Sequence, residues 1–401
     1  SKSEPGSFDK TCWGLFMGKK TGLEGYYVIR NNKKMRFGYT TGSCATAAAL
    51  GAAEMLLGEK KLSEISFMTP KGILLTLQLL EIEQEADAVT CAVRKDAGDD
   101  PDVTDGILVF ARVEKTKEKG IVLDGGEGIG RVTKPGLDQP VGEAAINHVP
   151  RSMILQAVES VAEKYAFCQG LKVTIFVPEG EKIAQKTFNP RLGIQNGISI
   201  LGTSGIVEPM SEKALTDSIG IEIRQHVAEG REYLLVTPGN YGQEYLKEHM
   251  ELSIEKSVKC SNYVGETIDM AMDAGVKGIL FVAHIGKFVK VGAGIMNTHS
   301  HNADARMETL AACAIRKGAS AECARKVLAC NTTEEALDVL EAEKMLQPAM
   351  ELLMEKIQFY LEHRSYNRLL LGAVVFSGEK GYLGETEHAR ELMKLLEKEY
   401  K

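Results

Sequence analysis

The fold of this chain is decided by a stretch of small residues, Gly38-Tyr39-Thr40-Thr41-Gly42-Ser43-Cys44-Ala45-Thr46-Ala47-Ala48-Ala49-Leu50-Gly51. Because alanine is the best helix former, the stretch predicts a helix from about Ser43 to Leu57 that ends at Gly58 as a C-cap. Thr41 or Ser43 is the expected cap of its first free N–H groups. Such a helix start suits an anion, but a tightly packed core helix with an ordinary cap explains the same residues.

Length and composition indicate a globular protein of two domains. The chain has 401 residues, more than a single typical core needs, of which 44% are hydrophobic and 26% charged. Its formal charge of −7 argues against nucleic acid as a partner, because nucleic-acid binders normally carry a basic face. We find no apolar run of the roughly 20 residues that span a bilayer, and residues 1–10 show no signal-peptide pattern. Eight cysteines without CxxC pairs favour reduced thiols, so we expect a cytoplasmic protein without a membrane partner.

Residues 1–195 show the mixed pattern of an α+β domain. After a leader, alternating apolar and polar residues predict a series of short strands, and one amphipathic helix covers residues 151–165. The predicted strands span residues 26–29, 64–68, 72–80, 88–93, 107–113, 120–123 and 171–177. Many strands with only two helices favour a layered α+β arrangement.

Residues 196–401 show a different order, in which a buried-type strand is repeatedly followed by a glycine- or hydroxyl-rich loop and a helix. This order is typical of a parallel, Rossmann-like α/β domain. Its predicted strands span residues 198–201, 232–236, 257–260, 278–283 and 369–376, and extra C-terminal helices occupy residues 304–364. Thr332 and Glu335 form a capping-box sequence within these helices. Ligands of parallel sheets lie outside the carboxyl ends of the strands, so the loops there are the expected binding site.

An acidic loop after the strand at residues 88–93 holds four carboxylates within seven residues, Asp96, Asp99, Asp100 and Asp102. A calcium loop is disfavoured because the bidentate glutamate is missing. Like charges this close should raise one another's pKa, which suits acid–base chemistry. A solvated turn is the simpler alternative.

A second loop, residues 124–136, is rich in glycine. It is not a dinucleotide-binding loop, because Lys134-Pro135-Gly136 would break the helix that must follow. Arg131 and Lys134 on this loop are suited to binding carboxylates. An irregular surface turn explains the loop nearly as well.

The richest polar cluster follows the strand at residues 278–283. It contains His284, Lys287 and Lys290, with Asn297-Thr298-His299-Ser300 soon after. This composition predicts acid–base chemistry and carboxylate binding, although a lone histidine is more often structural. His299 and His301 resemble a metal pair. No carboxylate or cysteine at ligand spacing completes it, although Asp304 lies close, and we rate metal well below substrate contact.

Several of these segments resemble the cobalt-precorrin-5B C1-methyltransferase family, CbiD. The resemblance starts with Gly38–Ala53 and Lys95–Thr104, continues through residues 124–136, 189–194, 284–294 and 303–308, and covers roughly residues 38–310. It implies a cytoplasmic enzyme of anaerobic cobalamin (vitamin B12) biosynthesis that uses S-adenosyl-L-methionine. The implied reaction methylates C1 of cobalt-precorrin-5B and gives cobalt-precorrin-6A. The substrate carries its own cobalt, so the resemblance implies no protein-bound metal.

The expected site residues follow from what methyl transfer to a flat, carboxylate-fringed corrin precursor requires, namely alignment of donor and acceptor and local positive charge. The expected acid–base residues are His284, His299, Asp99 and Asp100. The expected cofactor-binding residues lie in two turns after strands and are Gly239, Asn240, Tyr241, Gly242, Ser261, Asn262, Gly265 and Glu266. The expected substrate-binding residues are Thr40, Thr41, Ser43, Lys95, Asp96, Asp102, Arg131, Lys287, Thr298 and Arg306. Ordinary βα turns, with Glu266 as a first-turn helix residue, remain the alternative for the cofactor loops.

Two alternatives come from other functional classes. One is a non-catalytic carrier that binds the corrinoid and hands it on. The other is a phosphoryl-transfer enzyme that cradles phosphate at the Thr40–Ser43 helix start, although no GxxxxGK[ST] motif occurs. A homo-oligomer and transient contacts with neighbouring pathway enzymes are compatible with either the enzyme or the carrier.

Overall fold

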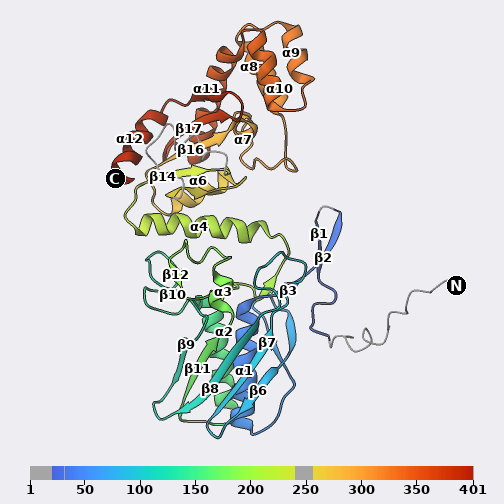
Figure 1. The fold of residues 1–401 in the computed structure, drawn as a ribbon, viewed down its shortest axis with the longest axis vertical. Helices are drawn as coiled ribbons and strands as arrows, with labels where there is room; N and C mark the ends of the chain where they lie inside the picture. The colour runs from blue at the N-terminus through green and yellow to red at the C-terminus, as the bar shows by residue number, and fades with distance from the viewer. Residues whose placement is uncertain (1–19, 31, 240–255, 401) are drawn as a thin grey trace, which may run out of the picture. The chain divides into compact units, whose positions relative to one another are not determined.

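The computed structural model describes residues 20–30, 32–239 and 256–400 (Figure 1). These residues form two compact units. The first unit contains the described residues before Pro135 together with Asp138–Ser211, and the second contains Pro135–Leu137 and the described residues from Glu212 onward. The mixture of helices with parallel and antiparallel sheets confirms the α/β class. The expected order of an α+β and a Rossmann-like domain, with its boundary between residues 195 and 196, remains a prediction.

The first unit is built on a five-stranded sheet in the order β6-β7-β8-β11-β9 (Figure 1). Strands β9 and β11 run parallel, and the other neighbours run antiparallel. The bounds of the five strands are β6 Leu80–Gln84, β7 Ala88–Arg94, β8 Leu108–Thr116, β9 Ile121–Gly125 and β11 Gly170–Phe176. Helices α1 (Thr41–Gly58) and α2 (His148–Lys164) pack against each other, and α1 lies on β7 and β8.

Short elements surround this core. They are β1 Tyr27–Arg30 with β2 Lys33–Arg36, β3 Gly38–Tyr39 with β13 Ile206–Val207, β4 Glu64–Met68 with β5 Leu74–Gln78, β10 Arg131–Val132 with β12 Ile194–Gln195, and α3 Gly180–Ala184. The strands predicted over residues 64–68 and 72–80 meet in the antiparallel β4–β5 pair. The single strand expected over residues 72–80 is wrong in its extent, because the chain leaves β5 after Gln78 and enters β6 at Leu80.

Helix α1 is buried along nearly its whole length, and this explains its run of small side chains. Ala45, Ala48 and Ala52 have no exposed surface, and the helix contacts two strands and α2 at once. Larger side chains would hold these neighbours apart, since protein interiors are close-packed. The expectation of a tightly packed core helix is confirmed.

The ends of α1 differ from the expected ones. Its N-cap is Thr40, neither Thr41 nor Ser43, and the Thr40 hydroxyl accepts the Ser43 N–H at 3.1 Å. The left-handed residue at its C-terminus is Glu59, one position after Gly58. Gly58 lies close to Tyr165 instead, because a Cβ there would lie 2.4 Å from the Tyr165 hydroxyl.

The second unit contains a five-stranded sheet in the order β15-β14-β16-β17-β18. The first four strands are parallel, and β18 pairs antiparallel with β17 at the edge. The strand bounds are β14 Tyr233–Thr237, β15 Val258–Lys259, β16 Gly278–His284, β17 Leu370–Ser377 and β18 Gly381–Glu385. The helix bounds are α4 Glu212–Ala228, α6 Val264–Asp273, α7 Ile285–Val291, α8 Arg306–Arg316, α9 Ala321–Leu328, α10 Thr333–Ala342, α11 Leu346–Ser365 and α12 Ala389–Tyr400.

Both faces of this sheet are covered. Leu235 and Leu280 pack with α12, whereas Leu234 and Ile279 belong to the larger core formed with the other helices. Since successive residues of a strand point to opposite faces, strands covered on both sides are apolar throughout. This explains the continuous apolar runs in the sequence.

Two expectations for the second unit need correction, and one is confirmed. Residues 198–201 are not the first strand of the parallel sheet, because Ile198 bridges to Ile129 and Ile200 to Ile146 in the first unit. Strand β18, Gly381–Glu385, is an addition to the expected sheet; its sequence is short, contains two glycines and lies partly exposed at the edge. The capping box of Thr332 and Glu335 is confirmed at the start of α10. Each helix in the described part of the chain is too short or too polar to cross a lipid bilayer.

Replacing Gly38 by alanine is expected to destabilise the first unit. A Cβ at Gly38 would lie 2.2 Å from the Ala97 carbonyl carbon and 2.4 Å from the Asp96 carbonyl oxygen, so the backbone must shift. We expect the free energy of unfolding in urea to fall by at least about 2 kcal/mol. Gly25→Ala is the matched control, because a Cβ at Gly25 meets no atom within 4 Å. Equal stability of the two variants would contradict this account of the packing.

Candidate functional site

The expected cofactor turns of the second unit meet at the carboxyl ends of its parallel strands. Strand β14 ends at Thr237, β15 at Lys259 and β16 at His284. We call the segments Thr237–Gly239, Cys260–Glu266 and His284–Lys287 the carboxyl edge. Asn240, Tyr241 and Gly242 lie outside the described residues.

Lys287 links the turns of the carboxyl edge. Its ammonium group donates hydrogen bonds to the Pro238 carbonyl at 2.7 Å and to the Ser261 carbonyl at 3.2 Å. Burial lowers the pKa of the half-buried Lys287 side chain. The structure thus joins three segments that are far apart in the sequence through one cation.

The segment after α7 is held against the same edge. The Thr298 N–H donates to the Asn262 carbonyl at 2.9 Å, and the Thr298 hydroxyl lies 3.2 Å from Oδ1 of Asn262. Buried Lys290 donates to the carbonyls of Thr298 at 3.1 Å and Ala303 at 2.9 Å. His299 is exposed, and its Nδ1 accepts the His301 N–H at 3.1 Å.

Gly265 and Glu266 lie in the first turn of α6, directly after the turn that follows β15. One carboxylate oxygen of Glu266, Oε2, is buried and has no hydrogen-bond partner in the described part of the chain. A Cβ at Gly265 would lie 2.9 Å from Cβ of Met296, so glycine is required there for close packing. A buried carboxylate oxygen without a donor is costly unless a further group satisfies it.

Arg306 lies at the start of α8 and is engaged by its neighbour Asp304. The guanidinium donates from Nε at 2.7 Å and from Nη2 at 2.9 Å, and this pair lowers the pKa of Asp304. A substrate carboxylate at Arg306 would therefore share the cation with Asp304.

His284 caps helix α7 and faces a carboxylate that sequence reasoning missed. Its Nδ1 accepts the Gly286 N–H at 3.1 Å, and its Nε2 lies 3.4 Å from Oε1 of Glu334 in α10. Oε2 of Glu334 accepts the hydroxyl of Ser377, at the end of β17, at 2.7 Å. The position of Ser377 at a strand end was a usable signal, whereas nothing in the sequence near Glu334 points to His284.

Each of the four carboxylates of the acidic loop has a partner within the first unit. Asp96 forms a two-point ion pair with Arg36 at 2.7 and 2.9 Å, and Asp99 accepts the Arg36 N–H at 2.5 Å. Asp100 accepts the Met210 N–H at 2.8 Å, and Asp102 pairs with buried Lys95.

The expectation that these carboxylates raise one another's pKa is wrong for Asp96 and Asp102. Burial raises both values, but the Arg36 guanidinium and the Gly98 N–H outweigh it at Asp96, and Lys95 with Thr104 outweighs it at Asp102. The pKa of each carboxyl therefore lies below its usual value. Opposite charges dominate over like charges here because the cations are closer.

The start of α1 uses its polar groups internally. The Thr41 hydroxyl accepts the Leu201 N–H at 2.9 Å, and the fully buried Ser43 hydroxyl donates to the Gly205 carbonyl at 2.6 Å. The N–H groups of Gly42, Ser43 and Cys44 donate to Leu201, to the Thr40 hydroxyl and to the Thr40 carbonyl. An anion at this helix start would have to displace bonds that already exist.

Arg131 is likewise engaged within its own loop. It forms a two-point ion pair with Asp124 at 2.8 and 3.0 Å and also donates to the Gly125 carbonyl at 2.7 Å. The expected carboxylate clamp thus has an internal carboxylate as its partner.

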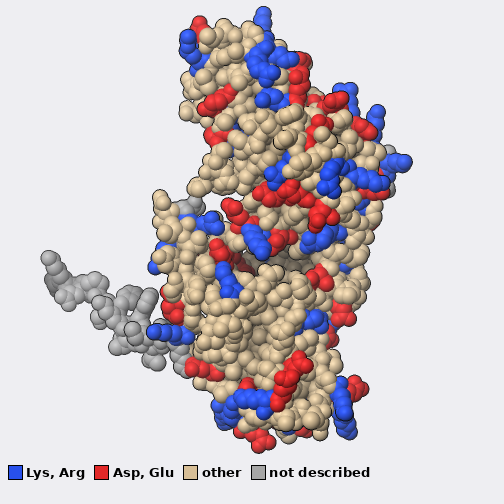
Figure 2. Space-filling view, turned by 180° about the vertical axis from the view of Figure 1, so that it is seen from behind, with Lys and Arg blue, Asp and Glu red and all other residues tan. Residues whose placement is uncertain are grey.

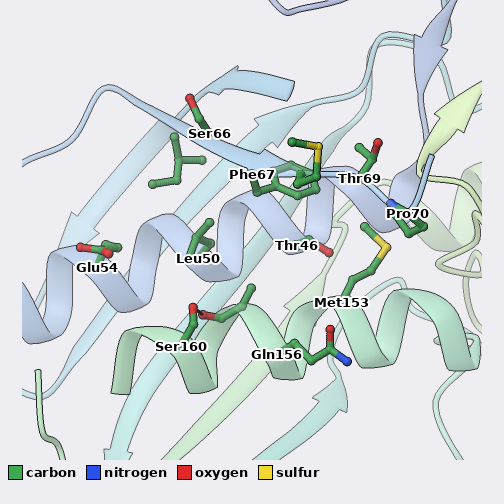
Figure 3. Close-up of a pocket in the computed structure, with 13 residues that line it drawn as sticks. Thr46, Leu50, Glu54, Ser66, Phe67, Thr69, Pro70, Met153, Gln156 and Ser160 are labelled. Carbon is green, nitrogen blue, oxygen red and sulfur yellow. Dashed lines mark hydrogen bonds between the residues drawn. The ribbon is translucent and has the colours of Figure 1, made fainter. Parts of the chain in front are cut away.

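A hollow of about 640 Å³ opens in the first unit between α1, α2 and β4 (Figure 3). Thr46 and Leu50 of α1, Phe67 of β4, and Met153 and Gln156 of α2 line it. Its lining holds none of the expected site residues and no Lys or Arg. It therefore offers no counter-charge to a polycarboxylate, and we place the candidate site at the carboxyl edge instead.

The described residues contain no group of three His, Cys, Asp or Glu side chains arranged to hold a metal ion. On the face of the molecule in Figure 2, acidic and basic side chains are interspersed. The ionisable side chains of the carboxyl edge include the half-buried Lys287, His284 and Glu266, and Glu334 of α10 lies beside His284.

Fold and site define a mixed α/β protein whose candidate ligand site lies at the ends of parallel strands. Two family descriptions that match this chain agree with the resemblance to CbiD seen in the sequence. The CbiD family matches residues 28–209, and its C-terminal domain, described as CbiD, C-terminal domain, matches residues 297–387.

Relatives cover almost the whole chain. The cobalt-precorrin-5B C(1)-methyltransferase of Ruminiclostridium cellulolyticum is 51% identical, covering 88% of this chain and 91% of the relative. The proteins of the same name from Alkaliphilus metalliredigens and Photorhabdus laumondii are 44% and 42% identical, covering 93% and 92% of this chain and 98% and 97% of the relatives. A crystal structure of the cobalamin biosynthesis protein (cbiD) from Archaeoglobus fulgidus is 28% identical, covers 71% of this chain and 89% of that chain, and has a TM-score of 0.38. The chain belongs to the CbiD family.

Removing the cation of Lys95 is expected to weaken the first unit. Lys95→Met leaves Asp102 without its main partner, so the free energy of unfolding should fall by about 2–3 kcal/mol at neutral pH. The lowered pKa of Asp102 stabilises the fold above its usual pKa, and this contribution is lost as the pH falls. The variant should therefore lose less stability between neutral and acidic pH than the parent protein.

Urea titrations at several pH values measure both effects. Lys61→Met is the matched control, because Lys61 is exposed, and it should change the stability by no more than about 0.5 kcal/mol. The same pH dependence in Lys95→Met and the parent protein would show that the Lys95–Asp102 pair does not set the pKa of Asp102.

Proposed function

We propose that this protein is an S-adenosyl-L-methionine-dependent methyltransferase that methylates C1 of cobalt-precorrin-5B to give cobalt-precorrin-6A in anaerobic cobalamin biosynthesis. The observation that carries the proposal is identity of 42–51% with proteins of that name, each aligned over at least 88% of this chain. A piece of shared fold would support much less, because one fold hosts many functions.

The carboxyl edge is the proposed cofactor site. Gly239, Ser261, Asn262, Gly265 and Glu266 would hold S-adenosyl-L-methionine, together with Asn240, Tyr241 and Gly242. The buried Oε2 of Glu266 supports this assignment, because a ribose hydroxyl or the cofactor amino group would supply the donor that it lacks. When bound, the cofactor supplies the methyl group as an electrophile.

The protein's own residues would orient the reactants. Lys287 fixes the two turns on either side of the proposed cofactor position, so that the turns are in place before the cofactor binds. Thr298 and Arg306 follow on the segment that Asn262 and Lys290 hold against the edge. We assign Thr298 and Arg306 as candidates for binding the substrate in the second unit. In the first unit, Lys95, Asp96, Asp102, Arg131 and the Thr40–Ser43 helix start remain separate substrate-binding predictions, and each already has a partner within that unit.

The acid–base candidates remain His284, His299, Asp99 and Asp100. Their surroundings differ: His299 is exposed, His284 has a protein group beside each ring nitrogen, and the two aspartates each accept a backbone N–H. Cytoplasmic location, self-association and contacts with other pathway enzymes remain predictions.

The alternatives make different demands on the structure. Phosphoryl transfer at the helix start is disfavoured, because the N–H groups of Gly42, Ser43 and Cys44 are already paired within the protein. A corrinoid carrier would use the same substrate contacts but would need no cofactor.

The enzyme and the carrier are distinguished by incubating the protein with cobalt-precorrin-5B and isotopically labelled S-adenosyl-L-methionine. The enzyme places one labelled methyl group on C1, whereas a carrier binds the corrinoid and transfers none.

Lys287→Ala is expected to loosen the cofactor turns while the fold stays intact. Losing two hydrogen bonds between them should weaken the binding of S-adenosylhomocysteine about tenfold, measured by calorimetry, and raise the KM for the cofactor similarly. Lys394→Ala is the matched control, because Lys394 is exposed on α12 of the same unit. An affinity and KM unchanged in Lys287→Ala would remove Lys287 from the site.

A further inference from the structure

The His284 ring has a protein group beside each of its nitrogens. Nδ1 accepts the Gly286 N–H at 3.1 Å as the cap of helix α7, and Nε2 lies 3.4 Å from Oε1 of Glu334. The edge of the ring also meets the Phe376 ring, with the two centroids 5.8 Å apart. This ring therefore has a defined orientation at the end of β16.

Glu334 reaches the sheet from a helix that is far away in the sequence. It lies in the first turn of α10, which the capping box of Thr332 and Glu335 fixes. Its other oxygen, Oε2, accepts the Ser377 hydroxyl at 2.7 Å, and Ser377 in turn accepts the N–H groups of Glu379 and Lys380 at 3.2 and 3.0 Å. The carboxylate is thus fixed on one side by the end of β17. Its buried Oε1 accepts no hydrogen bond from the described residues and faces Nε2 of His284 across 3.4 Å.

The hydrogen bonds decide which nitrogen carries the proton. A neutral imidazole has one donor and one acceptor nitrogen, and the bond made by one nitrogen sets the state of the other. Because Nδ1 accepts an N–H, the proton resides on Nε2, where it faces an anionic oxygen. A fully protonated ring would place a donor at Nδ1 against the Gly286 N–H.

We propose that Glu334 is a positioning residue for His284: it holds the imidazole, through Nε2, in one tautomer and one orientation at the carboxyl edge. The tautomer follows from the geometry alone, and its part in methyl transfer rests on the proposed function. A base that uses Nδ1 must first release the helix cap.

The charges around His284 support this arrangement. Burial lowers the pKa of the imidazole, and Glu334 opposes that effect. From its own helix, Lys287 is turned to the Pro238 and Ser261 carbonyls. Beyond β17, Lys380 pairs with Asp338 and Glu341 of α10 at 2.8 and 2.6 Å. Glu334 is therefore the carboxylate that the structure sets against the ring.

The test is nitrogen NMR of the ¹⁵N-histidine-labelled full chain, with the His284 signals assigned by loss in His284→Asn. In the parent protein we expect Nδ1 unprotonated and Nε2 protonated at neutral pH. In Glu334→Gln the pKa of His284 should fall by about 1, because a negative charge beside the ring is removed while an acceptor for Ser377 is kept. The pH profile of methyl transfer should move with it.

Glu335→Gln is the matched control. It removes the same charge from the same turn, keeps a capping-box residue and leaves His284 untouched. An Nδ1-protonated ring in the parent protein, or the same pKa in Glu334→Gln and Glu335→Gln, overturns the proposal. Should Glu334→Gln fail to fold, Ser377→Ala frees Oε2 and must still broaden or shift the His284 signals. The NMR result stands even if no methyl transfer is found, so failure of the proposed function is recognised separately.

Discussion

Burial of the second unit's parallel strands on both faces is the constraint on which the proposed site depends. Leu235 and Leu280 face α12, and Leu234 and Ile279 face the larger core, so the strands themselves carry apolar side chains. Polar side chains collect at the strand ends instead. There, one lysine joins the turns after β14 and β15 through their carbonyls. The edge is thus built before any ligand arrives, as catalysis by positioning requires.

Three of the cations expected to bind substrate are paired with aspartates that lie close to them in the sequence. The chain carries a formal charge of −7, yet its proposed substrate is fringed with carboxylates. The cations expected to meet them already hold loops: Arg131 binds Asp124, Arg306 binds Asp304, and Lys95 binds Asp102. Their first role is therefore to fix the shape of loops, and substrate carboxylates would meet them as partners shared with an aspartate. Lys287 differs, because its hydrogen bonds go to neutral carbonyls.

The features that could be predicted from the sequence are those set by the local pattern of residues. The alanine-rich helix, the strands of the parallel sheet and the Thr332–Glu335 capping box follow from propensity and spacing, and the structure contains all three. Residues 198–201 were misplaced, because an apolar run of four residues looks alike in either unit and pairing partners are not local. The pKa direction at Asp96 was wrong for a related reason, since Arg36 stands far away in the sequence. The role of Glu334 could not be predicted, because its partner His284 lies far away in the sequence, with helices α7, α8 and α9 between them. The roles of the expected site residues remain predictions.

The central claim is that the cofactor binds at the carboxyl edge of the second unit. A crystal structure of the protein with S-adenosylhomocysteine tests it most directly. The account predicts that the ligand contacts the turn at Pro238–Gly239 and the turn at Ser261–Glu266, with Oε2 of Glu266 accepting one of its donors. Ligand bound in the hollow between α1, α2 and β4, or anywhere away from those turns, would contradict it.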